Sequence, residues 1–224
     1  SFLFPKTIRR KIVHIYNFKS NYFCILGLTR KKIYKPNSKI VIIGSDEVFN
    51  CMQKNVRVGY SLDLFGKPFH SNELYSYAAS FGNTTIEQII ENNKEKELGD
   101  LLSQFKFISV RDDNSNNIVK KITNASVPVC VNLDPTLMYE NLVNEIPEID
   151  TKDNYIIVYA YDNRINEEER KAIERFALNN KLKIYIIGGV QSFGDKLIYD
   201  SPHNILGYFK KAKCVVTDTF HGTL

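Results

Sequence analysis

The residues of this sequence that could do acid–base chemistry or bind an anion come directly after short apolar segments. His221 follows the apolar residues 214–216 and a polar triplet, Thr217-Asp218-Thr219, which could cap a helix. In parallel α/β sheets, ligands bind beyond the carboxyl ends of the strands, where helix N-termini offer free N–H groups to anions. A histidine at such a turn could transfer a proton or contact an anion, or it could simply cap the helix.

Other polar side chains take equivalent places after other apolar segments. Asp46 and Asp134 could act on a ligand, but aspartates in such places more often cap helices or turns. Arg111 could bind an anion, or it could pair with a neighbouring aspartate on the surface. If the strands are parallel, the groups of each half of the chain gather at one sheet edge. These groups are Ser45, Asp46, Arg111, Asp112, Asp134, Asp162, Asp218 and His221.

The elements that would position these groups are strands alternating with helices. The sequence predicts strands at 39–43, 74–80, 107–110, 127–131, 155–159, 183–187 and 214–216. It predicts helices from Pro5 to Tyr16, at 84–104, at 166–180 and at 204–212, and a short helix that follows the turn at 111–115 and ends near residue 122. Within 166–180, we expect Ile173, Phe176 and Ala177 to face the core. This alternation is typical of a doubly wound α/β fold with parallel sheets.

The segment 141–153 is acidic, contains Pro147 and lacks periodicity, which is typical of a linker between domains. It would separate an N-terminal Rossmann-like domain, residues 1–140 with Arg111, from a C-terminal Rossmann-like domain, residues 154–224 with His221. Two such domains would leave a cleft between them. We expect the chain to be incomplete at both ends, because no strand with a Gly-rich loop opens it and because it stops within its last predicted helix.

The composition is that of a globular protein with a substantial core, since 43% of the 224 residues are hydrophobic and 25% are charged. No apolar run approaches the roughly 20 residues of a membrane-spanning helix. The four cysteines have no CxxC or metal-ligand spacing, so we expect free, buried thiols in a reducing cytoplasm. The carboxylates lie in separate motifs, so the sequence predicts no metal site.

The positive charge is concentrated at one end of the chain. Residues 1–35 contain nine Lys or Arg and no Asp or Glu, whereas the formal net charge of the whole chain is +5. Ile8, Ile12, Ile15 and Tyr16 are interleaved with basic residues, as in an amphipathic helix with a cationic face. This face could meet anionic lipid headgroups or an acidic glycan carrier, or it could be an ordinary solvated surface. No nucleic-acid-binding motif accompanies it.

Five short motifs, taken in order, resemble the polysaccharide pyruvyl transferase family. They are GSDEVFN at 44–50, YAASFG at 77–82, ISVRD at 108–112, DPTL at 134–137 and TDTFHGT at 217–223. The resemblance runs from about residue 40 to the end. It implies two Rossmann-like domains arranged as in glycosyltransferase-B enzymes. It also implies that the pyruvyl unit of phosphoenolpyruvate is transferred to a sugar of a surface polysaccharide or its precursor, to form a ketal.

The resemblance implies roles for residues of these motifs. His221 would contact the donor and act as an acid–base group, and Arg111 would bind the donor phosphate or carboxylate. Asp46 would bind or activate the acceptor hydroxyl. Ser45, Asp218, Thr219 and Gly222 would complete the substrate-binding set. Phosphoenolpyruvate is a substrate, so the resemblance implies no cofactor. The protein would meet its glycan acceptor in the cytoplasm or at the inner face of the membrane.

This sequence departs from the family pattern at Thr219, where many members carry arginine, and at Glu47 and Phe49, where glutamine and tryptophan are common. One positive contact to the donor is therefore either missing or supplied elsewhere. Two alternatives to pyruvyl transfer stay open. The same fold could serve a glycosyltransferase with a nucleotide-sugar donor, or a glycan-binding protein without catalysis.

Overall fold

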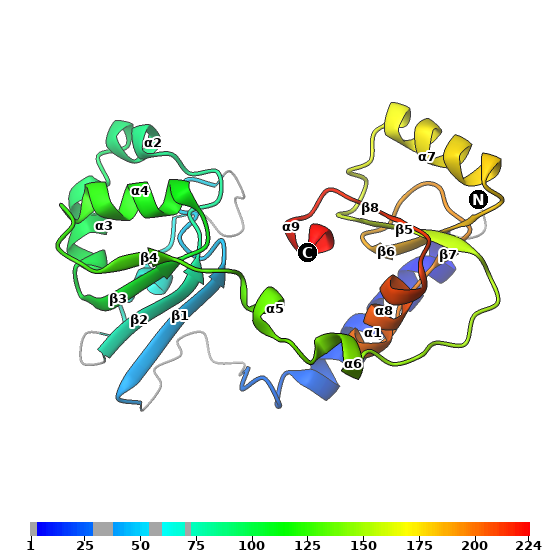
Figure 1. Cartoon of the computed structure of the whole chain (residues 1–224), viewed down its shortest axis with the longest axis horizontal. Coiled ribbons are helices and arrows are strands. Elements are labelled where there is room, and N and C mark those ends of the chain that lie inside the picture. The colour runs from blue at the N-terminus through cyan, green and yellow to red at the C-terminus, as the bar shows by residue number, and fades with distance from the viewer. Residues whose placement is uncertain (1–3, 29–37, 54–59, 70–72) are drawn as a thin grey trace. The chain divides into compact units, whose positions relative to one another are not determined.

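The structure, a computed structural model, describes residues 4–28, 38–53, 60–69 and 73–224 (Figure 1). The chain divides into two compact units. The terminal unit comprises Ser1–Arg30 and Glu140–Leu224, and the central unit comprises Lys31–Tyr139. Each unit contains a four-stranded parallel sheet, so the predicted mixed α/β architecture with parallel strands is confirmed. The first helix, which the sequence assigned to the same domain as Arg111, groups with the terminal unit.

The central unit contains the sheet β1-β2-β3-β4, in that order. Its strands are β1 (Ile40–Asp46), β2 (Glu73–Ala79), β3 (Phe105–Val110) and β4 (Val129–Val131). Its helices are the short 3-10 helix η1 (Asp63–Phe65), α2 (Ile86–Glu91), α3 (Glu95–Leu102), α4 (Asp113–Ile122) and α5 (Pro135–Met138). Every strand predicted in this part of the chain is present.

Helices α2, α3 and α4 lie on one face of this sheet (Figure 1). The strands follow one another in chain order, so every crossover steps in the same direction, and right-handed crossovers of that kind place their helices on one face. On β1, the side chain of Ile43 is buried whereas that of Ile42 is 67% exposed. The described part of this sheet is thus covered on one face, whereas the sequence predicted a doubly wound sheet with helices on both.

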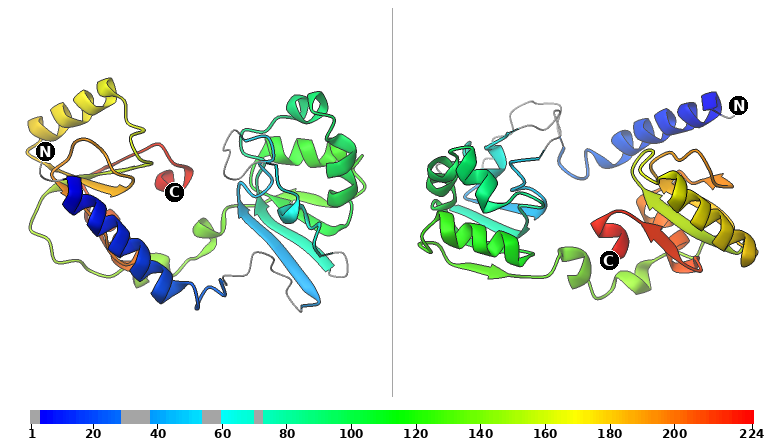
Figure 2. Two further views of the ribbon diagram at one scale, coloured as in Figure 1. Left: turned by 180° about the vertical axis from the view of Figure 1, so that it is seen from behind. Right: turned by 90° about the horizontal axis from the view of Figure 1, so that it is seen from above.

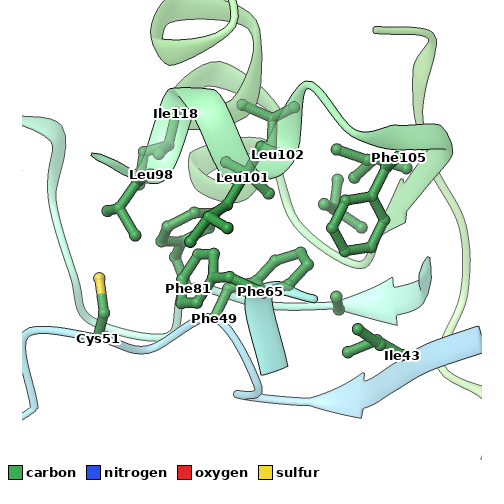
Figure 3. Close-up of a cluster of buried hydrophobic side chains, with 14 of the residues drawn as sticks. Ile43, Phe49, Cys51, Phe65, Phe81, Leu98, Leu101, Leu102, Phe105 and Ile118 are labelled. Carbon is green, nitrogen blue, oxygen red and sulfur yellow. The ribbon is translucent and has the colours of Figure 1, made fainter. Parts of the chain in front are cut away.

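The core of the central unit is an aromatic cluster between the sheet and its helices (Figure 3). The Phe49 ring stacks on Phe65 with centroids 4.9 Å apart and lies 5.4 Å from Phe81. Phe49 and Phe81 come from two of the family motifs. Since both rings are fully buried, these motif positions are explained by packing.

The helix predicted at 84–104 is two helices, α2 and α3. The break lies at Asn92 and Asn93. Asn93 has a left-handed φ of 55°, a conformation that asparagine tolerates better than most residues, and Asn92 donates through Nδ2 to the Gln88 carbonyl at 2.8 Å. The consecutive asparagines were the local signal that the single-helix prediction overlooked.

The terminal unit contains the sheet β7-β6-β5-β8. Its strands are β5 (Tyr155–Ala160), β6 (Lys183–Gly188), β7 (Lys196–Leu197) and β8 (Val215–Thr217). Its helices are α1 (Phe4–Tyr22), α6 (Leu142–Glu145), α7 (Glu167–Asn179), α8 (Pro202–Lys211) and α9 (Phe220–Thr223). The short strand β7 was not predicted. The other three strands of this sheet and its longer helices, α1, α7 and α8, were predicted.

This second sheet is doubly wound. Helices α7 and α8 lie on opposite faces of the sheet (Figure 2). Ile156 and Val158 of β5 pack with α7 residues, while Tyr155 and Ile157 pack with α8 residues. Successive side chains of a strand point to opposite faces of the sheet, so a strand that is buried on both faces contributes to two cores. The expectation that Phe176 faces the core is wrong, since its side chain is 49% exposed.

Two details of the terminal unit also differ from expectation. β8 pairs with β5 alone, at the edge of the sheet, and its residues are half-buried, although the sequence predicted a strand buried on both faces. The segment predicted as a linker packs partly on this unit. Ile149 joins the core on the α8 side, and Lys211 Nζ donates to the carbonyls of Ile149 and Thr151 at 3.0 and 3.1 Å.

Helix α1 contacts the rest of the terminal unit through polar and aromatic side chains. Lys11 Nζ lies 2.7 Å from Asp162 Oδ2, and the His14 ring stacks on Tyr199 with centroids 5.3 Å apart. Ile12 and Tyr16, which the sequence predicted on the apolar face, are 61% and 72% exposed. The helix itself was predicted, but the face that contacts the unit is the one with Lys11 and His14.

Candidate functional site

A cavity of about 310 Å³ opens at the carboxyl ends of β5, β6 and β8 in the terminal unit. The strand order reverses here, because the chain steps from β5 outward through β6 to β7 and then returns to place β8 on the other side of β5. Ligands of open α/β sheets bind at such a switch point. The residues around the cavity are Lys11, Tyr159, Ala160, Tyr161, Asp162, Gly188, Gly189, Thr219 and His221.

The glycine pair after β6 shapes one side of the cavity. Gly189 N–H donates to the Ala160 carbonyl at 2.7 Å, and a Cβ atom on Gly189 would overlap the backbone of Tyr161 and Asp162. Gly188 has a φ of 87°, which favours glycine. The two glycines therefore allow the end of β6 to pass against the loop after β5, and they contribute no side chain to the cavity.

The turn from β8 into α9 presents His221 to the cavity. Thr219 Oγ1 accepts a hydrogen bond from Gly222 N–H at 3.0 Å and lies 3.0 Å from Thr217 Oγ1, so the predicted cap is confirmed. A Cβ atom on Gly222 would overlap Thr217 Oγ1, which gives this glycine a packing role. His221 is exposed, and its ring centroid is 5.3 Å from that of Phe220.

Asp218 connects the same turn to the loop after β5. Its carboxylate lies 3.4 Å from Arg164 Nε, and the Arg164 guanidinium in turn lies over the Tyr161 ring, 5.4 Å from the centroid. Asp218 and Gly222 adjoin the cavity without lining it. The two residues therefore support the turn that carries Thr219 and His221.

Asp162 organises the opposite wall. Its carboxylate accepts hydrogen bonds from Lys11 Nζ at 2.7 and 3.0 Å and from Val190 N–H at 2.6 Å. The Lys11 ammonium, followed by the Val190 amide, holds the pKa of Asp162 below its usual range. Asp162 is consequently a carboxylate at neutral pH, and it holds the Lys11 ammonium at the cavity.

In the central unit, Arg111 joins two carboxylates from other motifs. Its Nη2 lies 2.9 Å from Asp46 Oδ1, and its Nη1 lies 3.2 Å from Asp134 Oδ2. The side chains of Arg111 and Asp134 are 7% and 1% exposed, whereas that of Asp46 is 59% exposed. Asp134 Oδ1 also accepts from Thr136 N–H at 3.0 Å, so its predicted role as a cap is confirmed. Ser45 precedes Asp46 at the same strand end and is half-buried.

Other motif residues of the central unit hydrogen-bond to one another. Asp112 caps α4 by accepting from Ser115 N–H at 2.7 Å, and it also accepts from the Ser80 hydroxyl at 2.6 Å. The Thr84 hydroxyl donates to Asn50 Oδ1 at 2.7 Å in a buried contact. These bonds tie the loops after β1, β2 and β3 together. They give Asn50, Ser80 and Asp112 of the motifs structural roles that the sequence alone did not reveal.

The predicted site residues thus form one group in each unit. Asp46, Ser45 and Arg111 lie at the carboxyl ends of β1 and β3 in the central unit. Thr219 and His221 line the cavity of the terminal unit, with Asp218 and Gly222 beside them. The sequence did not predict Lys11 as a site residue, because it lies 151 positions before its partner Asp162. Only the basic residues around Lys11 could have suggested contact with an anion.

Among the described residues, neither metal-ligand groups nor membrane-spanning helices are present. No three His, Cys, Asp or Glu side chains of that part of the chain are grouped as a metal site would require, and none of its helices could cross a bilayer. All four cysteines are free, as predicted, but only Cys51 is buried and Cys24 is exposed. Burial raises the pKa of the Cys51 thiol to about 11, so it is not a nucleophile at neutral pH.

Comparison with known proteins adds one finding. No curated protein and no solved structure matched this chain. The family model described as "Polysaccharide pyruvyl transferase" matches residues 3–224, including α1, which precedes the motifs noted in the sequence. Because this match spans essentially the whole chain, and because its motifs build the sheet edges described above, the chain belongs to the polysaccharide pyruvyl transferase family.

Proposed function

We propose that this protein transfers the pyruvyl unit of phosphoenolpyruvate to a sugar of a surface polysaccharide or its precursor and forms a pyruvate ketal. The observation that carries the proposal is the position of His221. In a chain of the pyruvyl transferase family, an exposed imidazole lines a cavity at the switch point of the terminal sheet. At about 310 Å³, this cavity is at the small end of ligand pockets, which suits a three-carbon phosphorylated acid.

The proposed reaction needs a proton donor and contacts for anions. Protonation of the donor methylene carbon makes the neighbouring carbon electrophilic, and a sugar hydroxyl attacks it and loses its proton. The bond from that carbon to the phosphate oxygen then breaks, and a second hydroxyl closes the ketal. Hydrogen phosphate carries away the surplus proton. We assign proton transfer at the donor to His221 and contacts beside it to Thr219, Asp218 and Gly222.

For the central unit, we propose that Arg111 binds the donor phosphate or carboxylate and that Asp46 and Ser45 receive the acceptor hydroxyl. Asp46 is exposed enough to meet a sugar, and Arg111 fixes one of its oxygens at 2.9 Å. The proposal includes a glycosyltransferase-B-like arrangement of two lobes, with the acceptor bound by the central unit. It requires no cofactor, because the donor carries the group that is transferred.

The loop after β5 favours this donor over a nucleotide sugar. Dinucleotides and nucleotide sugars are commonly held where a Gly-rich loop follows the first strand of a Rossmann unit. Here the loop after β5 runs Tyr161-Asp162-Asn163-Arg164 and contains no glycine, and the glycine pair comes instead after β6. This distribution suits a small anion better than a diphosphate that lies along a helix N-terminus.

Phosphoenolpyruvate is expected to raise the melting temperature of the full-length protein and to release inorganic phosphate when a suitable sugar is present. Binding to the folded state stabilises it by mass action, about 2.7 kcal/mol at 100 times Kd. The measurement is a thermal shift with phosphoenolpyruvate, followed by phosphate release with a panel of sugars. Stabilisation by a nucleoside diphosphate alone would support the nucleotide-sugar alternative, and stabilisation by glycans without phosphate release would support a binding protein.

Contact with anionic lipid is the second part of the proposal, and it would place the enzyme at the inner face of the membrane. Helix α1 carries no acidic residue, and Ile12 and Tyr16 are exposed on the same helix as the exposed Arg9. Such a helix can lie in the headgroup region through apolar burial and charge attraction.

The protein is therefore expected to float with vesicles that contain anionic phospholipid and to be released by high salt. Replacing Ile12 and Tyr16 together by serine is expected to reduce flotation severalfold. Vesicles of zwitterionic lipid serve as the control. Equal recovery with both kinds of vesicle, or no flotation at any salt concentration, would assign α1 to an ordinary solvated surface.

A further inference from the structure

Lys11 lines the cavity from a helix that lies outside both the five motifs and the strand ends of the terminal sheet. It comes from α1, and its side chain reaches the carboxyl ends of β5 and β6, where it lines the same cavity as Thr219 and His221. Its Nζ atom is held by both oxygens of Asp162, at 2.7 and 3.0 Å, while a third of its side chain remains exposed. The ammonium is thus held by a carboxylate on the wall of the cavity, and the lysine side chain is partly exposed.

The charge distribution around the cavity gives Lys11 a specific task. Within the described part of the chain, it is the one lysine or arginine among the lining residues. Thr219 contributes a hydroxyl that is engaged in capping α9, and the glycine pair contributes no side chain. An anionic ligand bound beside His221 would therefore find its permanent positive charge at Lys11.

The chemistry of the ammonium allows it to serve Asp162 and a ligand at once. A lysine ammonium has three N–H donors, and the two oxygens of Asp162 account for two of them. Asp162 is itself fixed by Val190 N–H at 2.6 Å, so it can act as a rigid holder for the lysine. The third donor remains for an oxygen of a carboxylate or phosphate, and a charge-assisted hydrogen bond of this kind is about twice as strong as a neutral one.

We propose that Lys11 binds an anionic group of the donor, its carboxylate or its phosphate, in the cavity that His221 lines, and that Asp162 positions Lys11 for this contact. The inference rests on the proposed function, because it assigns a new contact to the same donor. It also gives α1 a part in the donor site, although the helix lies far from the catalytic motifs in the sequence.

The test compares phosphoenolpyruvate binding and turnover for the wild-type protein, Lys11→Ala, Lys11→Gln and Lys19→Ala. Lys19 lies on the same helix and carries the same charge, but it is not a lining residue. We expect Kd and KM for phosphoenolpyruvate to rise about tenfold or more in both Lys11 variants, with a smaller change in kcat. Lys19→Ala is expected to match the wild type. Glutamine is one atom shorter than lysine but keeps an uncharged N–H donor directed toward Asp162, so it reports the loss of charge with less disturbance of α1 than alanine causes.

A rescue variant separates direct contact from a role in docking α1. Thr219→Arg, introduced into Lys11→Ala, returns a cation to the same cavity but does not restore the contact between α1 and Asp162. We expect it to recover the affinity for phosphoenolpyruvate severalfold, and this recovery would show that the cation contacts the donor directly. Wild-type binding of phosphoenolpyruvate together with unchanged Kd in Lys11→Ala and Lys11→Gln would overturn the inference and leave the proposed function intact. Absence of phosphoenolpyruvate binding by the wild type would instead overturn the proposed function, and this inference with it.

Discussion

Replacement of Arg111 by alanine is expected to destabilise the central unit by about 3–5 kcal/mol, because it removes the guanidinium that pairs with the buried carboxylate of Asp134. Asp134 is 1% exposed and lies 3.2 Å from Arg111 Nη1. Since native domains have only about 5–15 kcal/mol of stability in total, this loss is large. The measurement is urea unfolding of the variant and the wild type followed by circular dichroism.

The second carboxylate of this cluster provides the matched control. Asp46 is 59% exposed at 2.9 Å from Arg111 Nη2, and exposed pairs contribute little, so Asp46→Asn is expected to cost less than about 1 kcal/mol. The double variant Arg111→Ala with Asp134→Asn removes the stranded charge and is expected to recover part of the stability. A loss below about 1 kcal/mol for Arg111→Ala would contradict the structural account of this pair.

The double variant also tests the role of Arg111 toward the donor. Two carboxylates already neutralise its guanidinium, so loss of phosphoenolpyruvate binding in Arg111→Ala could reflect unfolding alone. If the double variant is folded, unfolding can no longer explain a loss of phosphoenolpyruvate binding. Loss of binding there would support donor contact by Arg111, and retained binding would assign Arg111 to the structure of the central unit.

Replacement of His221 by alanine is expected to lower kcat by about 100- to 10,000-fold, the range of a general acid or base, and to leave stability within about 0.5 kcal/mol of the wild type. The side chain is exposed, and Thr219 Oγ1 holds the turn that carries it by accepting a hydrogen bond from Gly222 N–H. The measurements are steady-state phosphate release from phosphoenolpyruvate and urea unfolding.

His203 is the matched control for this prediction. It is an exposed histidine near the start of α8, away from the cavity, and His203→Ala is expected to keep wild-type kcat and stability. If His221→Ala retained wild-type turnover in an active preparation, the imidazole would be reduced to a part of the turn. A large loss of stability with proportionate loss of activity would point to the same conclusion.

Local sequence patterns were sufficient to predict most of the strands and the longer helices, with many of their ends. Alternation of apolar runs with periodic segments predicted the strands, and capping residues predicted the start of α9 at Thr219 and of α5 at Asp134. These features depend on residues within a few positions of one another. The five motifs indicated the family, which the match over residues 3–224 established.

The tertiary structure decided how these elements are combined. The two sheets arise from similar strand–helix patterns. Among the described residues, one sheet has helices on one face and the other has helices on both, because the direction of each crossover is set by strand order. The pairing of Arg111 with Asp134 and the arrival of Lys11 at Asp162 join residues 23 and 151 positions apart. Such contacts depend on which strand ends become neighbours in space, and no local pattern of apolar, polar or charged residues encodes that choice.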